Sequence, residues 1–143
     1  MRALATVSTL ALALLSGCGD LLSPDPEAAE GVVIRVELVD HAAKRVDFRV
    51  VNRASETAFL ASCGGQVMIE VDREGDTGWT THSSSGPCPA IYEMSPLALK
   101  PGKSLPGERG VSEPGRYRLR AGVAFESDQR LEWTVTSDPF DLR

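Results

Sequence analysis

The chain is poor in the residues on which several common functions depend. It has 143 residues, of which two are histidines, three are cysteines and 6% are aromatic. Its formal net charge is −5 and no run of Lys and Arg offers the positive footprint that nucleic acids require. No Gly-x-Ser-x-Gly run surrounds a serine, and a zinc ligand set is missing. The sequence therefore predicts no nucleic-acid binding, no cofactor, no metal and no enzymatic activity.

Long hydrophobic runs are also missing, except in residues 1–17. Arg2 is the only charge there, and the apolar stretch behind it is too short to span a bilayer comfortably, as in a secretion signal. It ends in Leu15-Ser16-Gly17-Cys18, which resembles the lipobox of bacterial lipoproteins. The resemblance implies that residues 1–17 are a signal peptide and that Cys18, acylated, is the mature N-terminus. The alternative is an ordinary signal peptide, or a buried helix, with an incidental cysteine.

Residues 18–30 are expected to be a lipidated cysteine followed by a flexible tether. Residues 19–30 contain two prolines and four acids and follow neither a strand nor a helix period. Each buried acyl methylene contributes roughly 0.8 kcal/mol, so more than one chain holds a protein durably at a membrane. We expect a cell-envelope location facing the periplasm or the cell surface. Gly19 and Asp20 after the cysteine leave both the inner and the outer membrane open.

From Gly31 to Arg143, short runs of alternating apolar and polar residues are separated by Gly, Pro, Asn and Asp. This period of two is typical of half-buried β-strands. The clearest runs have these apolar members: Val32, Ile34, Val36 and Leu38; Val46, Phe48 and Val50; Tyr117, Leu119, Ala121, Val123 and Phe125. About seven or eight strands at this spacing predict an all-β domain over 31–143, an immunoglobulin-like two-sheet antiparallel β-sandwich. A small β-barrel is the alternative.

Three cysteines are an odd number for an exported protein, in which thiols usually pair. If Cys18 carries lipid, Cys63 and Cys88 remain. They flank a predicted hairpin around Gly75, and a hairpin brings its two ends together. The sequence therefore predicts a Cys63–Cys88 disulfide.

Two alternatives use the same region for chemistry. A soft-metal site for copper would need sulfur and imidazole ligands; its candidates are His82, Cys88 and Met94 with Cys63 or Met68. A serine hydrolase would need Ser84 or a neighbouring serine with His82 and an acid such as Asp76. Neither set follows a recognised motif, and oxidised cysteines cannot bind a metal as thiolates.

A stripe of arginines is the one candidate for ligand binding. Arg116, Arg118 and Arg120 share the polar face of a predicted strand and could hold an anionic partner such as a lipid headgroup or a polysaccharide. The simpler interpretation is cross-strand pairing with charged residues on neighbouring strands. The candidates for that pairing are Asp47, Arg49 and Glu132.

The aromatic residues are expected to be structural. Trp79 and Trp133 are more typical of sheet packing than of ligand platforms. Tyr117 begins a long strand, where tyrosines of sandwich domains donate a hydrogen bond back across a corner.

Four runs of residues, taken together, resemble a known family. They are Phe48-Arg49-Val50-Val51-Asn52, Val67 to Val71, Leu99-Lys100-Pro101-Gly102-Lys103-Ser104 and Pro114-Gly115-Arg116-Tyr117-Arg118-Leu119. In this order they are similar to the domain of BsuPI-type intracellular proteinase inhibitors and to immunoglobulin-like domains of bacterial lipoproteins. The resemblance spans Val46 to about Phe125. It implies an immunoglobulin-like fold and, as an activity, inhibition of a protease.

We expect a non-catalytic binding or structural module at the cell envelope, attached to the membrane through acylated Cys18 and meeting an envelope protein. The alternative is an inhibitor or regulator of an extracytoplasmic protease. Inhibition comes second because the chain is exported and carries the Cys63 and Cys88 pair, and both features depart from the inhibitor family.

Overall fold

Twelve β-strands, and no helix, make up the described part of the chain. The computed structural model describes residues 31–83, 88–91, 95–126, 131 and 133–143. The expectations for Cys18, the signal peptide and the tether lie outside these residues. The strands are β1 (Val32–Asp40), β2 (Arg45–Asn52), β3 (Ala58–Leu60), β4 (Ser62–Cys63), β5 (Gln66–Val67), β6 (Glu70–Gly75), β7 (Gly78–Ser83), β8 (Leu97–Leu99), β9 (Ser104–Gly110), β10 (Gly115–Ala124), β11 (Trp133–Thr136) and β12 (Phe140–Leu142). The described residues include no helix long and apolar enough to cross a membrane.

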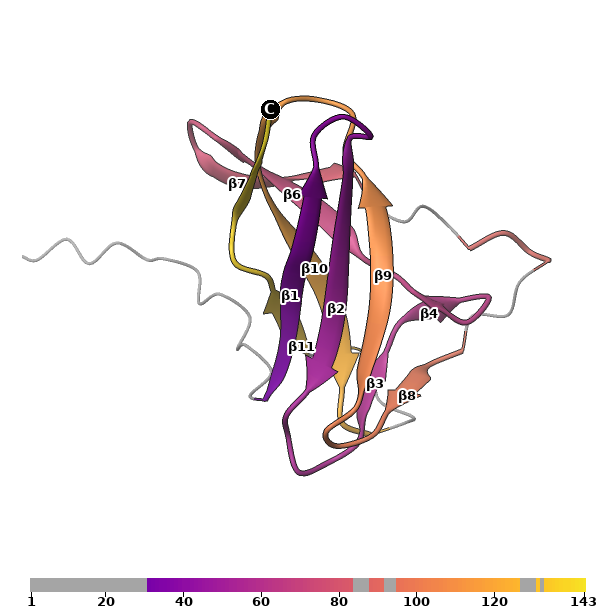
Figure 1. Cartoon of the computed structure of the whole chain (residues 1–143). Coiled ribbons are helices and arrows are strands. Elements are labelled where there is room, and N and C mark those ends of the chain that lie inside the picture. Colours follow the sequence, from indigo (N-terminus) through magenta and orange to yellow (C-terminus); the bar gives the residue numbers. More distant parts are fainter. Residues whose placement is uncertain (1–30, 84–87, 92–94, 127–130, 132) are drawn as a thin grey trace, which may run out of the picture.

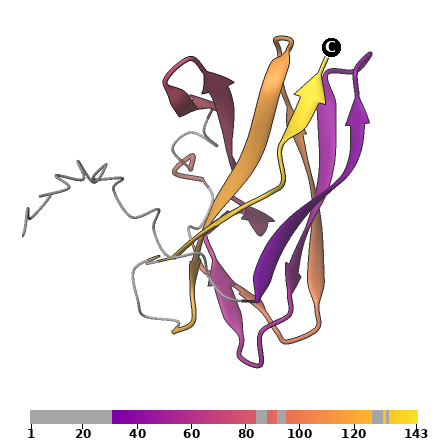
Figure 2. The ribbon, with the colours of Figure 1, turned by 90° about the vertical axis from the view of Figure 1, so that its left-hand side faces the viewer.

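The strands form two antiparallel sheets that face each other (Figures 1 and 2). The smaller sheet has the order β1-β2-β9, and the larger one has the order β7-β6-β10-β3-β8, with β11 and β12 also paired to β10. A separate hairpin joins β4 to β5. The sheets do not close into a barrel, so the predicted all-β sandwich is confirmed and the barrel alternative is wrong. The strand count exceeds the expected seven or eight because β4 and β5, of two residues each, also pair and because β9 was not predicted as a strand.

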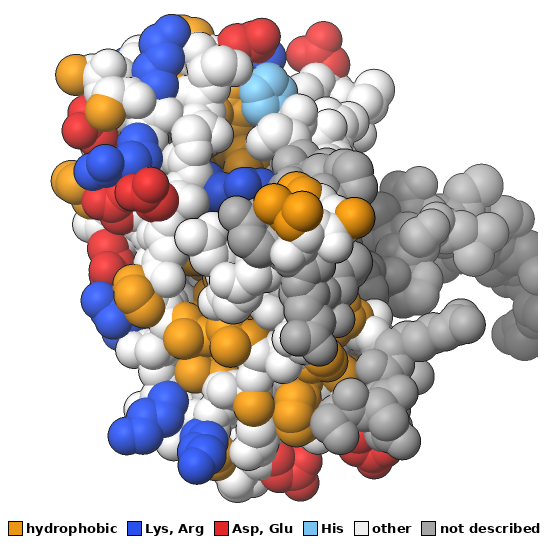
Figure 3. Space-filling view, turned by 90° about the vertical axis from the view of Figure 1, so that its right-hand side faces the viewer, with side chains coloured by type: hydrophobic (Ala, Val, Ile, Leu, Met, Phe, Trp, Pro, Cys, Tyr) orange, Lys and Arg blue, Asp and Glu red, His pale blue; other side chains and the backbone are white. Residues whose placement is uncertain are grey.

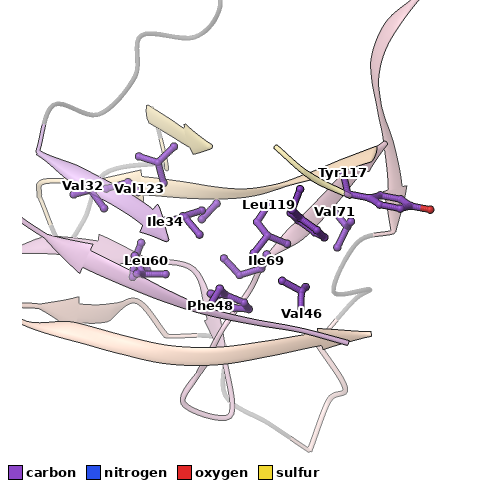
Figure 4. Packing of buried hydrophobic residues seen from close by; sticks show 14 of the residues in the cluster. Val32, Ile34, Val46, Phe48, Leu60, Ile69, Val71, Tyr117, Leu119 and Val123 are labelled. Atoms are coloured by element: carbon purple, nitrogen blue, oxygen red, sulfur yellow. The ribbon is translucent and has the colours of Figure 1, made fainter. Parts of the chain in front are cut away.

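The core lies between the two sheets, and the alternation seen in the sequence produces it. Along β2 every second residue is buried, and β10 follows the same rule from Tyr117 to Val123. Figure 4 shows these side chains meeting from both layers. The buried hydrophobic residues of the described chain all lie between Val32 and Leu142. Residues 31–143 therefore include all of the hydrophobic core that the structure describes.

One side of the sandwich is sealed by the last residues of the chain. Ile34 of β1 forms a parallel bridge with Ser137. Ser137 also fastens β10, because its amide donates to the Leu119 carbonyl at 2.9 Å and its hydroxyl accepts from the Leu119 amide at 2.9 Å. Farther along, the Arg143 amide donates to His41 Nδ1 at 3.1 Å. The opposite side, where β8 and β9 lie, has no such cover among the described residues.

The expected hydrogen bond across a corner is confirmed. The Tyr117 hydroxyl donates to the Glu113 carbonyl at 2.8 Å. The tyrosine is fully buried, its ring centroid lies 5.4 Å from that of His82, and burial raises the pKa of its hydroxyl. This corner fixes the start of β10.

The hairpin between β6 and β7 is confirmed, but its turn is shorter than expected. The sequence from Arg73 to Gly78 has turn composition, yet β6 continues to Gly75 and only Asp76 and Thr77 form the loop. Arg73 lies in the strand because it pairs with Thr80 of β7. The backbone hydrogen bonds between β6 and β7 outweigh the preference of the local sequence for a turn.

Candidate binding surfaces

A hollow with a mixed polar and apolar lining lies on the open side of the sandwich. It has a volume of about 370 Å³ and is lined by residues of β2, the β4–β5 hairpin, β8 and β9. Its apolar walls come from four strands: Phe48, Val67, Leu97 and Leu105. Figure 3 shows exposed apolar side chains gathered on this side of the molecule. A hollow of this size and lining can take a few apolar side chains of a peptide or a small apolar molecule.

Gly107 shapes the floor of this hollow. It lies in β9 opposite Phe48, and a Cβ added there would overlap the Phe48 ring, with Cε2 at 2.7 Å. The ring is 2% exposed and packed into the core, so it has little room to move. Only glycine lets the β9 backbone lie directly over this ring.

We expect Gly107→Ala to lower the free energy of unfolding by about 2 kcal/mol, because it overpacks a well-filled core. Gly110→Ala is the matched control on the same strand, since nothing lies within 4 Å of its added Cβ. Urea denaturation of both variants measures the difference. Equal midpoints for the two variants would contradict this account of the Phe48 contact.

Arg109 brings a cation to the edge of the hollow. One of its guanidinium nitrogens, Nη2, donates to the Ile69 carbonyl at 2.6 Å, which links β9 to the opposite layer. Burial lowers the pKa of Arg109. The hollow therefore combines apolar side chains with a polar rim that includes Gln66, Glu108 and Arg109.

The arginine stripe lies on the outer face of the larger sheet, and each arginine meets an acid of β6. The pairs are Arg116 Nε with Glu74 Oε2 at 3.6 Å, Arg118 Nε with Asp72 Oδ2 at 3.1 Å, and Arg120 Nη2 with Glu70 Oε2 at 2.5 Å. Cross-strand pairing therefore describes this face, and three carboxylates balance three guanidinium groups. The stripe has no surplus of positive charge with which to attract an anionic ligand.

The pairing partners expected from the sequence differ from those observed. Asp47 lies 3.0 Å from Arg45, and Arg49 lies 2.6 Å from Glu37, all in the smaller sheet. β10 is instead hydrogen-bonded to β6, which brings its acids into register. Glu132 lies outside the described residues. Cross-strand pairing was predicted correctly, and Asp47 and Arg49 were the wrong partners.

The two tryptophans pack on the sheets, as expected. The Arg118 guanidinium lies 4.8 Å from the centroid of the Trp79 ring, and Trp133 packs against the core. Arg118 therefore lies between Trp79 and the carboxylate of Asp72, of which only 4% of the side chain is exposed.

We expect Arg118→Ala to lower the free energy of unfolding by about 1 to 2 kcal/mol. The substitution removes the nearest cation from a buried carboxylate, and only Arg120, at 3.5 Å, remains beside it. Arg116→Ala is the control, because Arg116 is 55% exposed and an exposed pair contributes little. Chemical denaturation should separate the two variants, and an Arg116 effect as large as that of Arg118 would contradict the role given to burial.

A disulfide joins Cys63 of β4 to Cys88, as the sequence predicts, with their Cα atoms 5.6 Å apart. Both sulfurs are therefore unavailable as thiolates for the copper alternative. Within the described ranges, no three His, Cys, Asp or Glu side chains gather where they could hold a metal ion. Met94 and Ser84, which the copper and hydrolase alternatives need, lie outside those ranges. His82 packs against Tyr117.

The hollow was not found from the sequence. β9, which forms one of its walls, contains Pro106, Gly107 and Gly110, and these residues indicate turns rather than a strand. Leu105 was the one local signal, an apolar residue within a polar run. The remaining walls come from segments far apart in the chain. No protein-family model matches the chain, and no curated protein matches it.

Proposed function

We propose that this protein is a lipid-anchored cell-envelope protein whose sandwich is a non-catalytic binding module, with the hollow as its binding site. The observation that carries the binding role is the hollow itself. Leu97 and Leu105 leave apolar surface accessible on the open side, beside strands whose edges are unpaired in the described chain. Accessible apolar surface of this kind is typical of sites that bind a partner. We expect the partner to be an envelope protein that inserts apolar side chains.

Site-specific crosslinking in the native envelope tests the binding role. A photoreactive residue at Gln66, exposed at the rim of the hollow, is expected to give a discrete crosslinked species. The same residue at Leu38, 51% exposed on β1, is the control and should give none. The substitution Leu97→Asp should abolish the Gln66 product, and Leu38→Asp should leave it unchanged. A Gln66 product that survives Leu97→Asp, or no product at all, would refute the assignment of the hollow.

The membrane anchor depends on the Leu15-Ser16-Gly17-Cys18 tetrad. Mass spectrometry of protein from the native host should find residues 1–17 removed and acyl chains on Cys18. A free Cys18 thiol with the leader still attached would refute the anchor. The crosslinking result does not depend on this outcome.

Ile91 supports the second candidate function, which is inhibition of an extracytoplasmic protease. Its side chain is 84% exposed and follows Cys88, which the disulfide holds to β4. An exposed apolar side chain on a tethered segment has the form that a protease specificity pocket accepts. A panel of serine proteases tests this function: inhibition that Ile91→Asp abolishes and Leu38→Asp preserves would support it, and no inhibition at micromolar protein would rule it out.

A further inference from the structure

The open edges of the two sheets differ in how they are protected against pairing with another chain. Natural sheets guard their edges with prolines, charges, short strands or covering segments, because an unguarded edge is a template for a further strand. The edge strands of the described chain are β1, β9, β8, β7 and also β11 and β12, which pair only with β10. β11 and β12 are short, with four and three residues, and β1, β9 and β8 are guarded as well.

β9 is interrupted by proline. The Lys103 carbonyl accepts from the Asn52 amide, so this position faces β2. The Val111 amide donates to the Lys44 carbonyl, so that position faces β2 as well. By alternation, the even-numbered residues between them direct their backbone groups to the open edge. Pro106 is one of these residues and has no N–H to offer.

β8 and β1 are guarded in other ways. β8 has only three residues and is followed by Lys100 and Pro101. β1 is bridged by Ser137 and carries the charged residues Arg35 and Glu37. Neither strand offers a long, uncharged row of backbone groups.

β7 has none of these protections among the residues that the structure describes. Its sequence is Gly-Trp-Thr-Thr-His-Ser, six residues without a proline, Lys, Arg, Asp or Glu. Threonine and tryptophan favour extended structure. β7 is the last strand of its sheet, and Figure 2 shows its hairpin with β6 at the margin of the sandwich, away from β1 and β9. A second molecule can therefore approach this edge without meeting the other layer.

The register of the hairpin gives the direction of the β7 backbone groups. The two-residue loop of Asp76 and Thr77 is flanked by the pair Gly75 and Gly78, and such loops close on a hydrogen-bonded pair. Hydrogen-bonded and non-hydrogen-bonded pairs alternate along an antiparallel ladder. The backbone amide and carbonyl of Thr80 therefore point toward β6. The amides and carbonyls of Trp79 and Thr81 point toward the open edge.

We propose that β7 is a dimerisation edge, on which a second copy of this chain pairs antiparallel through its own β7. A two-fold axis at Thr80 places Trp79 of each copy opposite Thr81 of the other. Those are the residues with free backbone groups, so both pairs can exchange N–H···O bonds. Aromatic residues opposite β-branched ones, and threonine opposite threonine, are favourable cross-strand neighbours.

The second copy fits this edge because the edge is complementary to itself. No charge on β7 would meet a like charge in the symmetric pair. The same surface serves both subunits, as a two-fold interface requires. The pairing joins the larger sheets of the two copies into one continuous sheet and covers the β7 edge. The proposal needs neither the lipid anchor nor the hollow.

The test is a charge swap at Thr80, which is exposed and lies opposite its own copy in the proposed dimer. In analytical ultracentrifugation over a concentration series, the full chain with the natural sequence should dimerise reversibly. Thr80→Lys and Thr80→Asp, each alone, place like charges face to face and should weaken the dimer about tenfold or more. An equal mixture of the two variants should restore it, which a folding defect could not do.

Thr77→Lys and Thr77→Asp are the controls, because Thr77 lies in the exposed loop and does not meet its own copy. These variants should dimerise like the natural sequence. A monomer throughout the soluble concentration range would overturn the proposal. A dimer that persists equally in both Thr80 variants, or variants that fail to recombine when mixed, would overturn it as well.

Discussion

Replacing Asn52 with alanine is expected to lower the free energy of unfolding by about 3 kcal/mol. Asn52 is the only asparagine of the chain, and its side chain is fully buried at the end of β2. Its amide nitrogen donates to the Glu56 carbonyl and to the Leu99 carbonyl, both at 2.7 Å. Its side-chain oxygen accepts from the Ala54 amide at 2.9 Å. One side chain thus satisfies three backbone groups, two in the loop after β2 and one in β8.

The size of this effect comes from the groups that alanine would leave behind. A buried donor or acceptor without a partner costs about 1 to 3 kcal/mol. The bond between Asn52 and the Leu99 carbonyl is buried, so the substitution would leave a buried carbonyl without its partner. The backbone of Asn52 also binds Lys103 and Gly102, so loss of the side chain should loosen the loop between β8 and β9.

Ser62→Ala gives the comparison for this prediction. Ser62 is also buried, but its hydroxyl makes one hydrogen bond, to the Ser95 carbonyl at 2.6 Å. Its replacement should cost about 1 kcal/mol. Urea unfolding followed by tryptophan fluorescence measures both variants. If Asn52→Ala proved no more destabilising than Ser62→Ala, the three hydrogen bonds of the Asn52 side chain would contribute less to the free energy of unfolding than we expect.

Removing the Cys63–Cys88 disulfide is expected to cost about 3 to 4 kcal/mol. The bond closes a loop with a sequence separation of 25 residues. Most of its stabilisation comes from restricting the unfolded chain. Within the folded state it holds β4, which has only two residues and pairs only with β5 in the described structure.

The measurement is the unfolding midpoint of Cys63→Ala, Cys88→Ala and the double variant, each compared with the oxidised natural protein. All three variants should be destabilised by similar amounts, because each lacks the same bond. Oxidised and reduced natural protein should differ by the same margin. If reduction left the midpoint unchanged, the disulfide would contribute nothing to stability, contrary to the chain-entropy argument.

The strands with regular alternation could be predicted from the sequence, and the pairing of strands could not. Val46, Phe48 and Val50 indicate β2, and the run from Tyr117 to Val123 indicates β10, because a period of two specifies one buried face. The position of Arg118 on a polar strand face predicts that it pairs with an acid. Nothing in the sequence around it, however, indicates whether that acid is Asp72 or Asp47. That choice depends on which strands are neighbours, and the topology of the whole domain decides it.

The candidate sites were predictable to different degrees for the same reason. The disulfide could be predicted because hairpin geometry relates Cys63 to Cys88 over a short stretch. The hollow could not, because Phe48, Val67, Leu97 and Leu105 come together only when both sheets are assembled. Pro106 and Gly107 also made β9 hard to predict, because proline and glycine are typical of turns. In this strand the proline suits an open sheet edge, and the glycine allows the close approach to the Phe48 ring.

The hydrogen bond between the Arg143 amide and His41 Nδ1 has a practical consequence. It places the last residue beside the turn between β1 and β2, at the end of the sandwich opposite Gly31 (Figure 1). A fluorescent reporter or an affinity peptide fused after Arg143 would therefore project away from the point where the chain enters the domain. Such a fusion would start on the side of the sandwich away from β8 and β9, where the hollow lies, and it offers a handle for following this protein.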